Sequence, residues 1–167
     1  MPHAEKSWSG MRKYLEQDML APALRGRVRY DCAAYPGANH AIRFQVFVDG
    51  ERISQFSMET MAKELYDGGK PTDISRFWST YWDVKENAPV SERNVHDDWE
   101  FAAALRDYRH MDIQTALTSE NPIVRMFAVL DRRVGKRTLE KLREQADAQP
   151  QWLQFYYQLR LSAEGLL

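Results

Sequence analysis

His96 is followed directly by Asp97 and Asp98, and this stretch is the best suited to acid–base or metal chemistry. An imidazole beside carboxylates can relay protons or bind a divalent cation. If Asp98 begins a helix, however, three adjacent side chains cannot all face one ion. An acidic residue at the N-cap position explains the same pattern without a site. Two interpretations therefore stay open, an enzyme that uses His96 with Asp97 or Asp98 and a simple helix cap.

Four cationic residues fall within positions 132–137, which we call the basic joint: Arg132, Arg133, Lys136 and Arg137. Such a cluster could bind a phosphate backbone or an acidic protein surface. It could equally form ion pairs within the chain, because the acidic region 97–112 is close in sequence and cations suit the negative end of a helix. The sequence does not decide between these alternatives.

A dense aromatic stretch includes Trp78, Tyr81 and Trp82. Together with Tyr156 and Tyr157, these rings could line a ligand groove or stack on bases. Rings at this density are also typical of a hydrophobic core or a dimer contact. Exposure decides between the two, because two or more exposed indoles would favour a binding surface.

Other signatures of chemistry are missing from the sequence. Cys32 is the only cysteine, which excludes an intrachain disulfide and a cysteine cluster for zinc. It shares a predicted strand face with Val28 and Tyr30, so we expect a small buried hydrophobe rather than a nucleophile. There is no Gly-x-Ser-x-Gly, Walker or Gly-x-Gly-x-x-Gly pattern. No cofactor and no metal is therefore predicted.

Composition indicates an ordinary soluble domain. The chain has 167 residues, 44% of them hydrophobic and 28% charged, with a net charge of −1. Bulk charge thus neither attracts nor repels nucleic acid. We expect a cytoplasmic protein without membrane contact, because no apolar run approaches a membrane span and the N-terminus lacks the apolar stretch of a signal peptide.

The first part of the chain predicts an antiparallel β-meander. Apolar residues alternate with polar ones in 28–32 and 42–48, and Asp49-Gly50 is a strong signal for a two-residue hairpin turn. The returning strand is expected to end at Ser57. Amphipathic helices are expected at 8–20 and 58–67 on either side of these strands, and Gly68-Gly69-Lys70-Pro71 breaks the second of them.

The second part is predicted to be helical. Residues 77–82 have weak periodicity, so helix and irregular structure both remain open there, and Lys85–Asn94 is expected to be the main loop. Asn121 is expected to cap a helix that starts at Pro122, and Gly135 to supply a left-handed turn where that helix ends. The expected helices cover about 98–109, 112–118, 122–132, 136–147 and 150–163.

Two segments, Ser119–Arg125 and Leu130–Arg137, resemble a small family of uncharacterised bacterial proteins. The likeness extends to Trp8-Ser9, to the Pro22–Val28 segment and to the strand residues around Val48–Ser57. It implies a bacterial cytoplasmic origin and carries no activity, cofactor or catalytic residue.

Taken together, the sequence predicts a single α+β domain, with a three-stranded antiparallel meander and flanking helices followed by a C-terminal bundle of short helices. We divide it into an N-terminal part of about 1–70, an aromatic connector of about 71–95 and a helical part of about 96–167. The leading functional hypothesis is a non-catalytic protein-interaction module, in which the basic joint steers a partner protein and aromatic residues anchor it. Nucleic-acid binding through the joint is the first alternative, catalysis at His96 the second, and a homodimer is compatible with all three.

Overall fold

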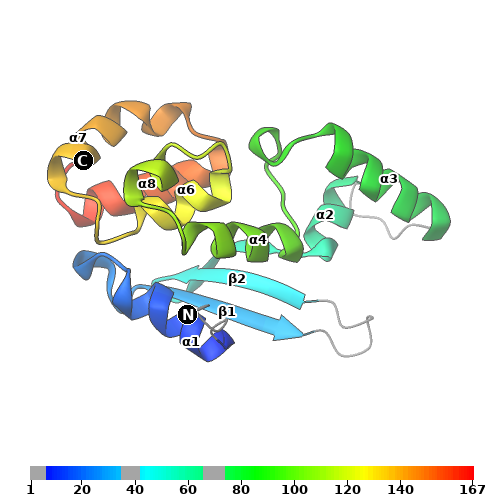
Figure 1. Cartoon of the computed structure of the whole chain (residues 1–167), viewed down its shortest axis with the longest axis horizontal. Coiled ribbons are helices and arrows are strands. Elements are labelled where there is room, and N and C mark those ends of the chain that lie inside the picture. The colour runs from blue at the N-terminus through cyan, green and yellow to red at the C-terminus, as the bar shows by residue number, and fades with distance from the viewer. Residues whose placement is uncertain (1–6, 35–41, 66–73) are drawn as a thin grey trace.

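A computed structural model describes residues 7–34, 42–65 and 74–167 of the chain. It confirms the predicted α+β architecture: a three-stranded antiparallel sheet with flanking helices, followed by C-terminal helices (Figure 1). The strands are β1 (Val28–Ala34), β2 (Ile42–Val48) and β3 (Glu51–Phe56). The α-helices are α1 (Trp8–Lys13), α2 (Met58–Leu65), α3 (Ile74–Asn87), α4 (Asp98–Tyr108), α5 (Ile113–Leu117), α6 (Pro122–Val129), α7 (Lys136–Gln145) and α8 (Gln151–Ala163). Short π or 3₁₀ turns follow α1 (Tyr14–Asp18), precede β1 (Pro22–Leu24), follow α3 (Val90–Glu92) and follow α7 (Ala146–Ala148).

The sheet has the order β1-β2-β3, and β2 lies in its centre. Asp49 and Gly50 form the tight turn between β2 and β3, with φ values of 52° and 84°. Both values lie in the left-handed region that this hairpin turn requires, as the sequence predicted. A bulge between Val46 and Phe47 shifts the register of the second pair of strands.

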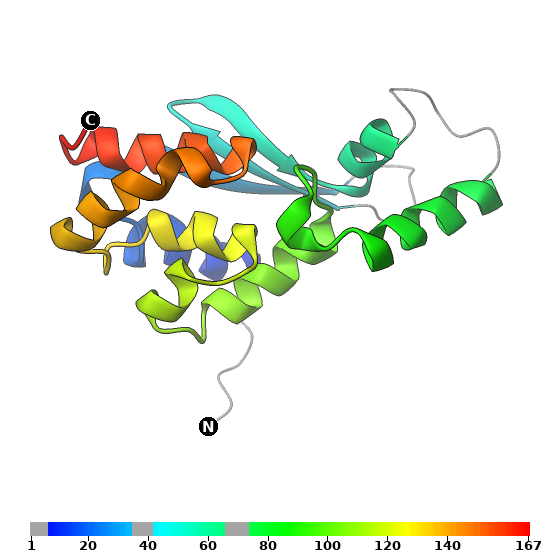
Figure 2. The same cartoon turned by 90° about the horizontal axis from the view of Figure 1, so that it is seen from above.

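Helices cover one face of the sheet (Figure 2). The side chains on that face include Tyr30, Val46 and Phe56, and all three are buried in one apolar core with residues of α4, α6 and α8. Phe44 stacks on Phe101 of α4, with ring centroids 4.4 Å apart. Alternation along the strands therefore produced the core face that the sequence predicted. The opposite face of the sheet carries polar residues together with Phe47.

The N-terminal helix is shorter than predicted. Regular α-helix ends at Lys13, and a π-helical turn continues to Asp18. The chain then pairs with the segment after α6, because Leu20 and Asp131 form an isolated antiparallel bridge and the Arg132 N–H donates to the Met19 carbonyl. This pairing joins the segment before β1 to the segment between α6 and α7.

Two predictions about the C-terminal helices need correction. The helix predicted for 122–132 ends at Val129, because the chain turns there to reach the bridge with Leu20. Gly135 has a φ of −82° and is the N-cap of α7, so it does not make the left-handed turn that we expected. The predicted cap at Asn121 is confirmed, since its side chain accepts a hydrogen bond from the Ile123 N–H at 3.0 Å.

The connector also differs from its prediction. Residues 77–82 lie within α3, and this helix continues through Lys85 to Asn87. The predicted loop from Lys85 to Asn94 is therefore wrong in its first part, and Val90–Glu92 adds a 3₁₀ turn after Pro89. Helices α2 and α3 lie at one end of the molecule, far from α7 (Figures 1 and 2). The predicted breaker at 68–71 lies outside the described residues. None of the described helices is both long enough and apolar enough to cross a membrane.

Candidate functional site

Two tryptophans lie exposed side by side where α3 meets the start of α4. Trp82 of α3 is 46% exposed and Trp99 of α4 is 49% exposed. Their rings are nearly parallel, with an angle of 18° and centroids 5.9 Å apart. Indoles are large apolar groups that are mostly buried in folded proteins, so two of them exposed at one corner are an unusual feature of this surface.

The ammonium group of Lys85 lies beside both indoles and contacts each of them. Its ammonium nitrogen is 5.3 Å from the centre of the Trp82 ring and 5.1 Å from that of Trp99. Both distances are within the range of a cation–π interaction. Because one turn of α3 separates Trp82 from Lys85, the helix itself holds the cation next to the first ring. We call Trp82, Lys85 and Trp99 the tryptophan corner.

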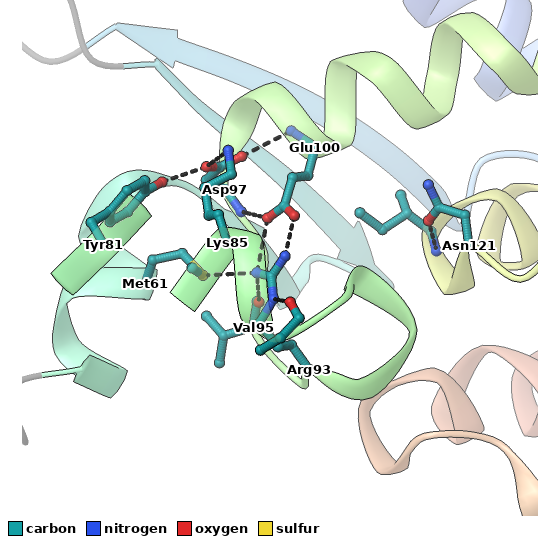
Figure 3. Close-up of polar contacts among 10 residues, drawn as sticks. Met61, Tyr81, Lys85, Arg93, Val95, Asp97, Glu100 and Asn121 are labelled. Atoms are coloured by element: carbon teal, nitrogen blue, oxygen red, sulfur yellow. Dashed lines mark hydrogen bonds and ion pairs between the residues drawn. The ribbon is translucent and has the colours of Figure 1, made fainter. Parts of the chain in front are cut away.

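Asp97 holds Lys85 of the tryptophan corner from the protein interior. This residue is fully buried and its Oδ2 accepts hydrogen bonds from the Tyr81 hydroxyl and from Lys85 Nζ, the latter at 2.8 Å (Figure 3). Its Oδ1 accepts from the Glu100 N–H at 2.9 Å, which makes Asp97 the N-cap of α4. Burial, followed by the hydrogen bond to Asp97, raises the pKa of Tyr81. One carboxylate thus fixes α3 against α4.

Arg93 and Glu100 form a second tie beside this anchor. The Arg93 guanidinium forms an ion pair with Glu100 and also donates to the Val95 carbonyl and to Met61 Sδ (Figure 3). Glu100 completes a capping box, because its carboxylate accepts from the Asp97 N–H at 3.1 Å. A cavity of about 250 Å³ lies next to Arg93, lined mainly by apolar side chains. Arg93 also donates to the Ala88 carbonyl at 2.8 Å. The loop between α3 and α4 is therefore fixed after α3 by Arg93 and before α4 by the capping box.

His96 does not take part in an acid–base pair. Its side chain is 2% exposed and packs between Phe56 and Trp152, with ring centroids 6.4 and 5.5 Å away. Neither ring nitrogen has a hydrogen-bond partner in the described part of the chain. Burial lowers the pKa of His96 to about 4, so the ring is neutral at pH 7.

The two following acids are also placed apart from His96. Asp97 directs its oxygens to Tyr81, Lys85 and the start of α4, as described above. Asp98 is buried, and burial raises the pKa of its carboxyl. The structure thus assigns Asp97 the capping role that the sequence allowed, and the described residues present no His96–carboxylate contact that could move a proton. No group of three or more His, Cys, Asp or Glu side chains within the described ranges has the geometry to hold a metal ion.

All four cations of the basic joint are exposed, and one of them, Arg133, is paired with a carboxylate of the chain. Arg133 forms an ion pair with Asp131 at 2.8 Å, and this hydrogen-bonded pairing raises the pKa of Arg133. Arg132, Lys136 and Arg137 are exposed and form no ion pair with any other described residue. The acids of region 97–112 do not cover them: Asp97 binds Lys85, and Asp112 caps α5.

Asp131 is the centre of a buried polar cluster beside the joint. It is 1% exposed and accepts hydrogen bonds from the Tyr108 hydroxyl and from the Arg133 guanidinium and N–H. Arg160 of α8 donates to the carbonyls of Val129, Asp131 and Val134. We call Tyr108, Asp131, Arg133 and Arg160 the Asp131 cluster. Every strong polar group in it is satisfied within the chain.

A family model matches residues 7–161, which is nearly the whole chain. The protein belongs to the SF0329 protein family. That description names no activity and no ligand. No curated protein and no solved structure matches the chain. The function of this SF0329 family member therefore has to be argued from its own residues.

The aromatic residues predicted as a site fall into different environments in this SF0329 protein. Trp82 is exposed, Trp78 is half-buried and Tyr81 is fully buried with its hydroxyl on Asp97. Tyr156 and Tyr157 are buried in the core. Cys32, predicted to be a buried hydrophobe, is half-buried, and burial raises the pKa of its thiol.

Sequence reasoning missed Trp99 and Lys85 as members of the site. Trp99 follows the acids at the start of α4, and Lys85 was assigned to a loop. A helix through 78–88 would have placed Lys85 one turn after Trp82 and Tyr81, which was the available signal. The stacking of Trp99 on Trp82 joins two helices and has no counterpart in local sequence.

Proposed function

We propose that this protein is a non-catalytic protein-interaction module of the bacterial cytoplasm, and that it binds its partner through the tryptophan corner. The single observation that carries this proposal is the pair of half-exposed, parallel indoles of Trp82 and Trp99. Tryptophan is among the residues most enriched at the centres of protein interfaces. Two such rings offer a large apolar area to a partner.

The anchoring of the corner supports the same proposal. Lys85 and Asp97 hold the two rings from the protein side, so little side-chain freedom remains to be lost on binding. Binding free energy is reduced by the ordering of mobile side chains, and a preformed surface avoids much of that loss. The described part of the chain offers no comparable preformed arrangement for a reaction, because His96 is neutral, buried and without a hydrogen-bonding partner.

The exposed cations of the basic joint are expected to act on association rather than on the contact itself. Arg132, Lys136 and Arg137 would attract an acidic partner over distances up to about 10 Å at moderate salt. The joint also keeps nucleic-acid binding as a second candidate, since the same three cations could contact phosphates. A linear loss of affinity with the logarithm of salt concentration, abolished by K136E/R137E, would support that second candidate.

The experiment compares two matched aromatic variants in partner capture. W82A/W99A removes both indoles, whereas F155A removes another exposed aromatic side chain, 38% exposed, from α8. Proteins retained by the wild type and by F155A but absent with W82A/W99A are purified and titrated calorimetrically against the wild type. We expect at least one direct complex that weakens more than tenfold in W82A/W99A. If every direct complex survives the double substitution, the corner is not the interface.

A further inference from the structure

The outer face of the sheet carries an aromatic ring between two arginines. Phe47 of β2 pairs with Arg29 of β1 on one side and with Arg52 of β3 on the other. Paired residues of neighbouring antiparallel strands share a face of the sheet, so the three side chains form one row. We call this row the Arg–Phe–Arg row.

The row is open to solvent. Phe47 is half-buried and does not join the core cluster, in contrast to Phe44 and Val46 on the same strand. Helices α4, α6 and α8 lie on the other face of the sheet (Figure 2), and the described helical residues that reach the outer face are Arg12 of α1, beside the row, and Glu59 and Thr60 of α2, which contact Arg43 and Gln55. A hollow of about 370 Å³ lies beside the row and is lined by Arg12, Arg29, Asp31 and Phe47 together with the turn at Gly50. A ligand can therefore reach the ring and the arginines together.

Charge at the row favours an anionic ligand. Arg29 and Arg52 are both exposed, and neither forms an ion pair with a described residue. Arg52 donates to the Gln55 side-chain oxygen at 3.2 Å, a neutral partner that leaves its charge uncompensated. The next row contains Asp31, Gln45 and Gln55, and the two amides are hydrogen-bonded to each other at 3.1 Å. The Arg–Phe–Arg row thus carries two cations without an ion pair to a described residue, one on each side of the Phe47 ring, and the single carboxylate of the next row, Asp31, leaves an excess of positive charge.

We propose that the Arg–Phe–Arg row binds single-stranded nucleic acid. Neighbouring strands lie about 4.8 Å apart, which places cationic groups on both sides of the Phe47 ring at close range. A base stacked on the ring would then bring its flanking phosphates towards Arg29 and Arg52. Aromatic rings for bases combined with cations for the backbone are the general means of binding single strands without a fixed sequence. A duplex keeps its bases stacked inside and offers no free base face to Phe47.

The row is separate from the tryptophan corner, so the two proposals can fail independently. Trp82 and Trp99 belong to α3 and α4, whereas the row belongs to the three strands. The row is also separate from the basic joint, which lies between α6 and α7. Variants in each region therefore distinguish the three surfaces.

The test is a fluorescence-anisotropy titration of the full chain with a labelled ten-nucleotide oligo-uridine at low salt. We expect F47A to weaken binding about tenfold or more, which corresponds to the loss of one stacked base. R29A/R52A is expected to weaken it by a similar factor. The slope of log affinity against log salt should also become shallower by about 0.7 for each phosphate that is no longer neutralised. F47W keeps an aromatic face and is expected to retain binding. Unchanged circular dichroism and melting temperature show that each variant is folded.

The matched control is K141A/R143A, which removes two exposed cations from α7 outside the basic joint and should bind oligo-uridine as the wild type does to within a factor of about three. A ten-residue polyglutamate and a duplex of equal length are the competing ligands. The proposal is overturned if no binding is seen at about 50 mM salt, if F47A binds as tightly as the wild type, or if polyglutamate or duplex displaces the oligonucleotide equally well. Loss of binding in K136E/R137E with retention in R29A/R52A would transfer the site to the basic joint.

Discussion

A buried carboxylate lies at each end of helix α4, and the two have different surroundings. At its start, Asp97 holds Tyr81 and Lys85 and thereby supports two exposed indoles. At its end, Tyr108 donates to Asp131, which also accepts from the guanidinium and the backbone N–H of Arg133. With 11 residues the helix separates the two places by about 16 Å.

The contrast between the two ends is one between a structural cluster and the proposed binding surface. In the Asp131 cluster, side-chain donors and acceptors find partners in the chain, and little is left to offer another molecule. At the tryptophan corner, the polar groups are equally satisfied but a large apolar area remains in water. Polar satisfaction with exposed aromatic surface is the combination expected of a preformed interface.

The largest effect is expected from Asp131→Ala. Removing a buried carboxylate that pairs with Arg133 and Tyr108 should lower the free energy of unfolding by about 3–5 kcal/mol. Urea denaturation followed by circular dichroism measures this change. Asp112→Ala is the control, because this exposed helix cap should cost only about 1 kcal/mol. Equal losses in the two variants would contradict the structural role of the Asp131 cluster.

Acid should destabilise the protein through His96. The pKa of His96 is about 4 in the folded state and 6.5 in its ordinary state, so the unfolded chain takes up the proton first as pH falls. The stability contributed by neutral His96 is therefore complete above pH 6.5 and is lost progressively as the pH falls to 4, by about 3 kcal/mol. Urea denaturation of wild type and His96→Leu between about pH 7 and pH 4 isolates this contribution.

His96→Leu keeps the buried volume but cannot be protonated. The free energy of unfolding of the wild type, measured relative to that of His96→Leu, should therefore fall as the pH decreases. A difference that stays constant over this range would show that His96 keeps an ordinary pKa in the fold. Such a result would also reopen a role for His96 in proton transfer.

Lys85→Met tests whether the corner is ordered by its cation. The substitution removes the ion pair with Asp97 and the interactions with both rings, and should lower the free energy of unfolding by about 1–3 kcal/mol. It should also increase quenching of tryptophan fluorescence by acrylamide, because Trp82 and Trp99 lose their support. Lys85→Arg keeps the charge and is the control. Unchanged quenching in Lys85→Met would mean that packing alone fixes the rings.

The smallest effect on stability is expected from Trp82→Ala and Trp99→Ala. Each ring is about half exposed, so each substitution should lower the free energy of unfolding by about 1 kcal/mol or less. Phe127→Ala in the core should cost about 3–5 kcal/mol by comparison. Urea denaturation of the three variants measures the contrast. A loss at Trp82 as large as that at Phe127 would indicate that the corner serves the fold and not a partner.

The sequence was sufficient for elements with strong local signals. Alternation in β2, the Asp49-Gly50 turn and the cap at Asn121 are all present in the structure because each depends on neighbouring residues. The connector was harder, since aromatic residues in α3 hide its helical period. The end of α6 was misplaced because Asp131 pairs with Leu20 and Tyr108, which are far away in the chain.

The candidate site was predictable only in part for the same reason. Asp97 could be assigned as a cap from its position before a helix, and Trp82 could be named as an aromatic candidate. The stacking of Trp82 on Trp99, and the placement of Lys85 beside both, depend on how α3 meets α4. The basic joint attracted attention through composition, yet Arg133 is held by its near neighbour Asp131. The density of positive charge in the sequence did not reveal which of these cations would form an ion pair within the chain.

Site-specific photo-crosslinking in the native host tests the central claim most directly. A benzoylphenylalanine replaces Glu86, which is exposed on α3 one turn after Trp82, or Arg137, which is exposed in the basic joint. We predict a partner adduct from position 86 that disappears when W82A/W99A is added, and a weaker adduct or none from position 137. An adduct from position 137 alone, or an adduct from position 86 that persists without the two tryptophans, would contradict the account.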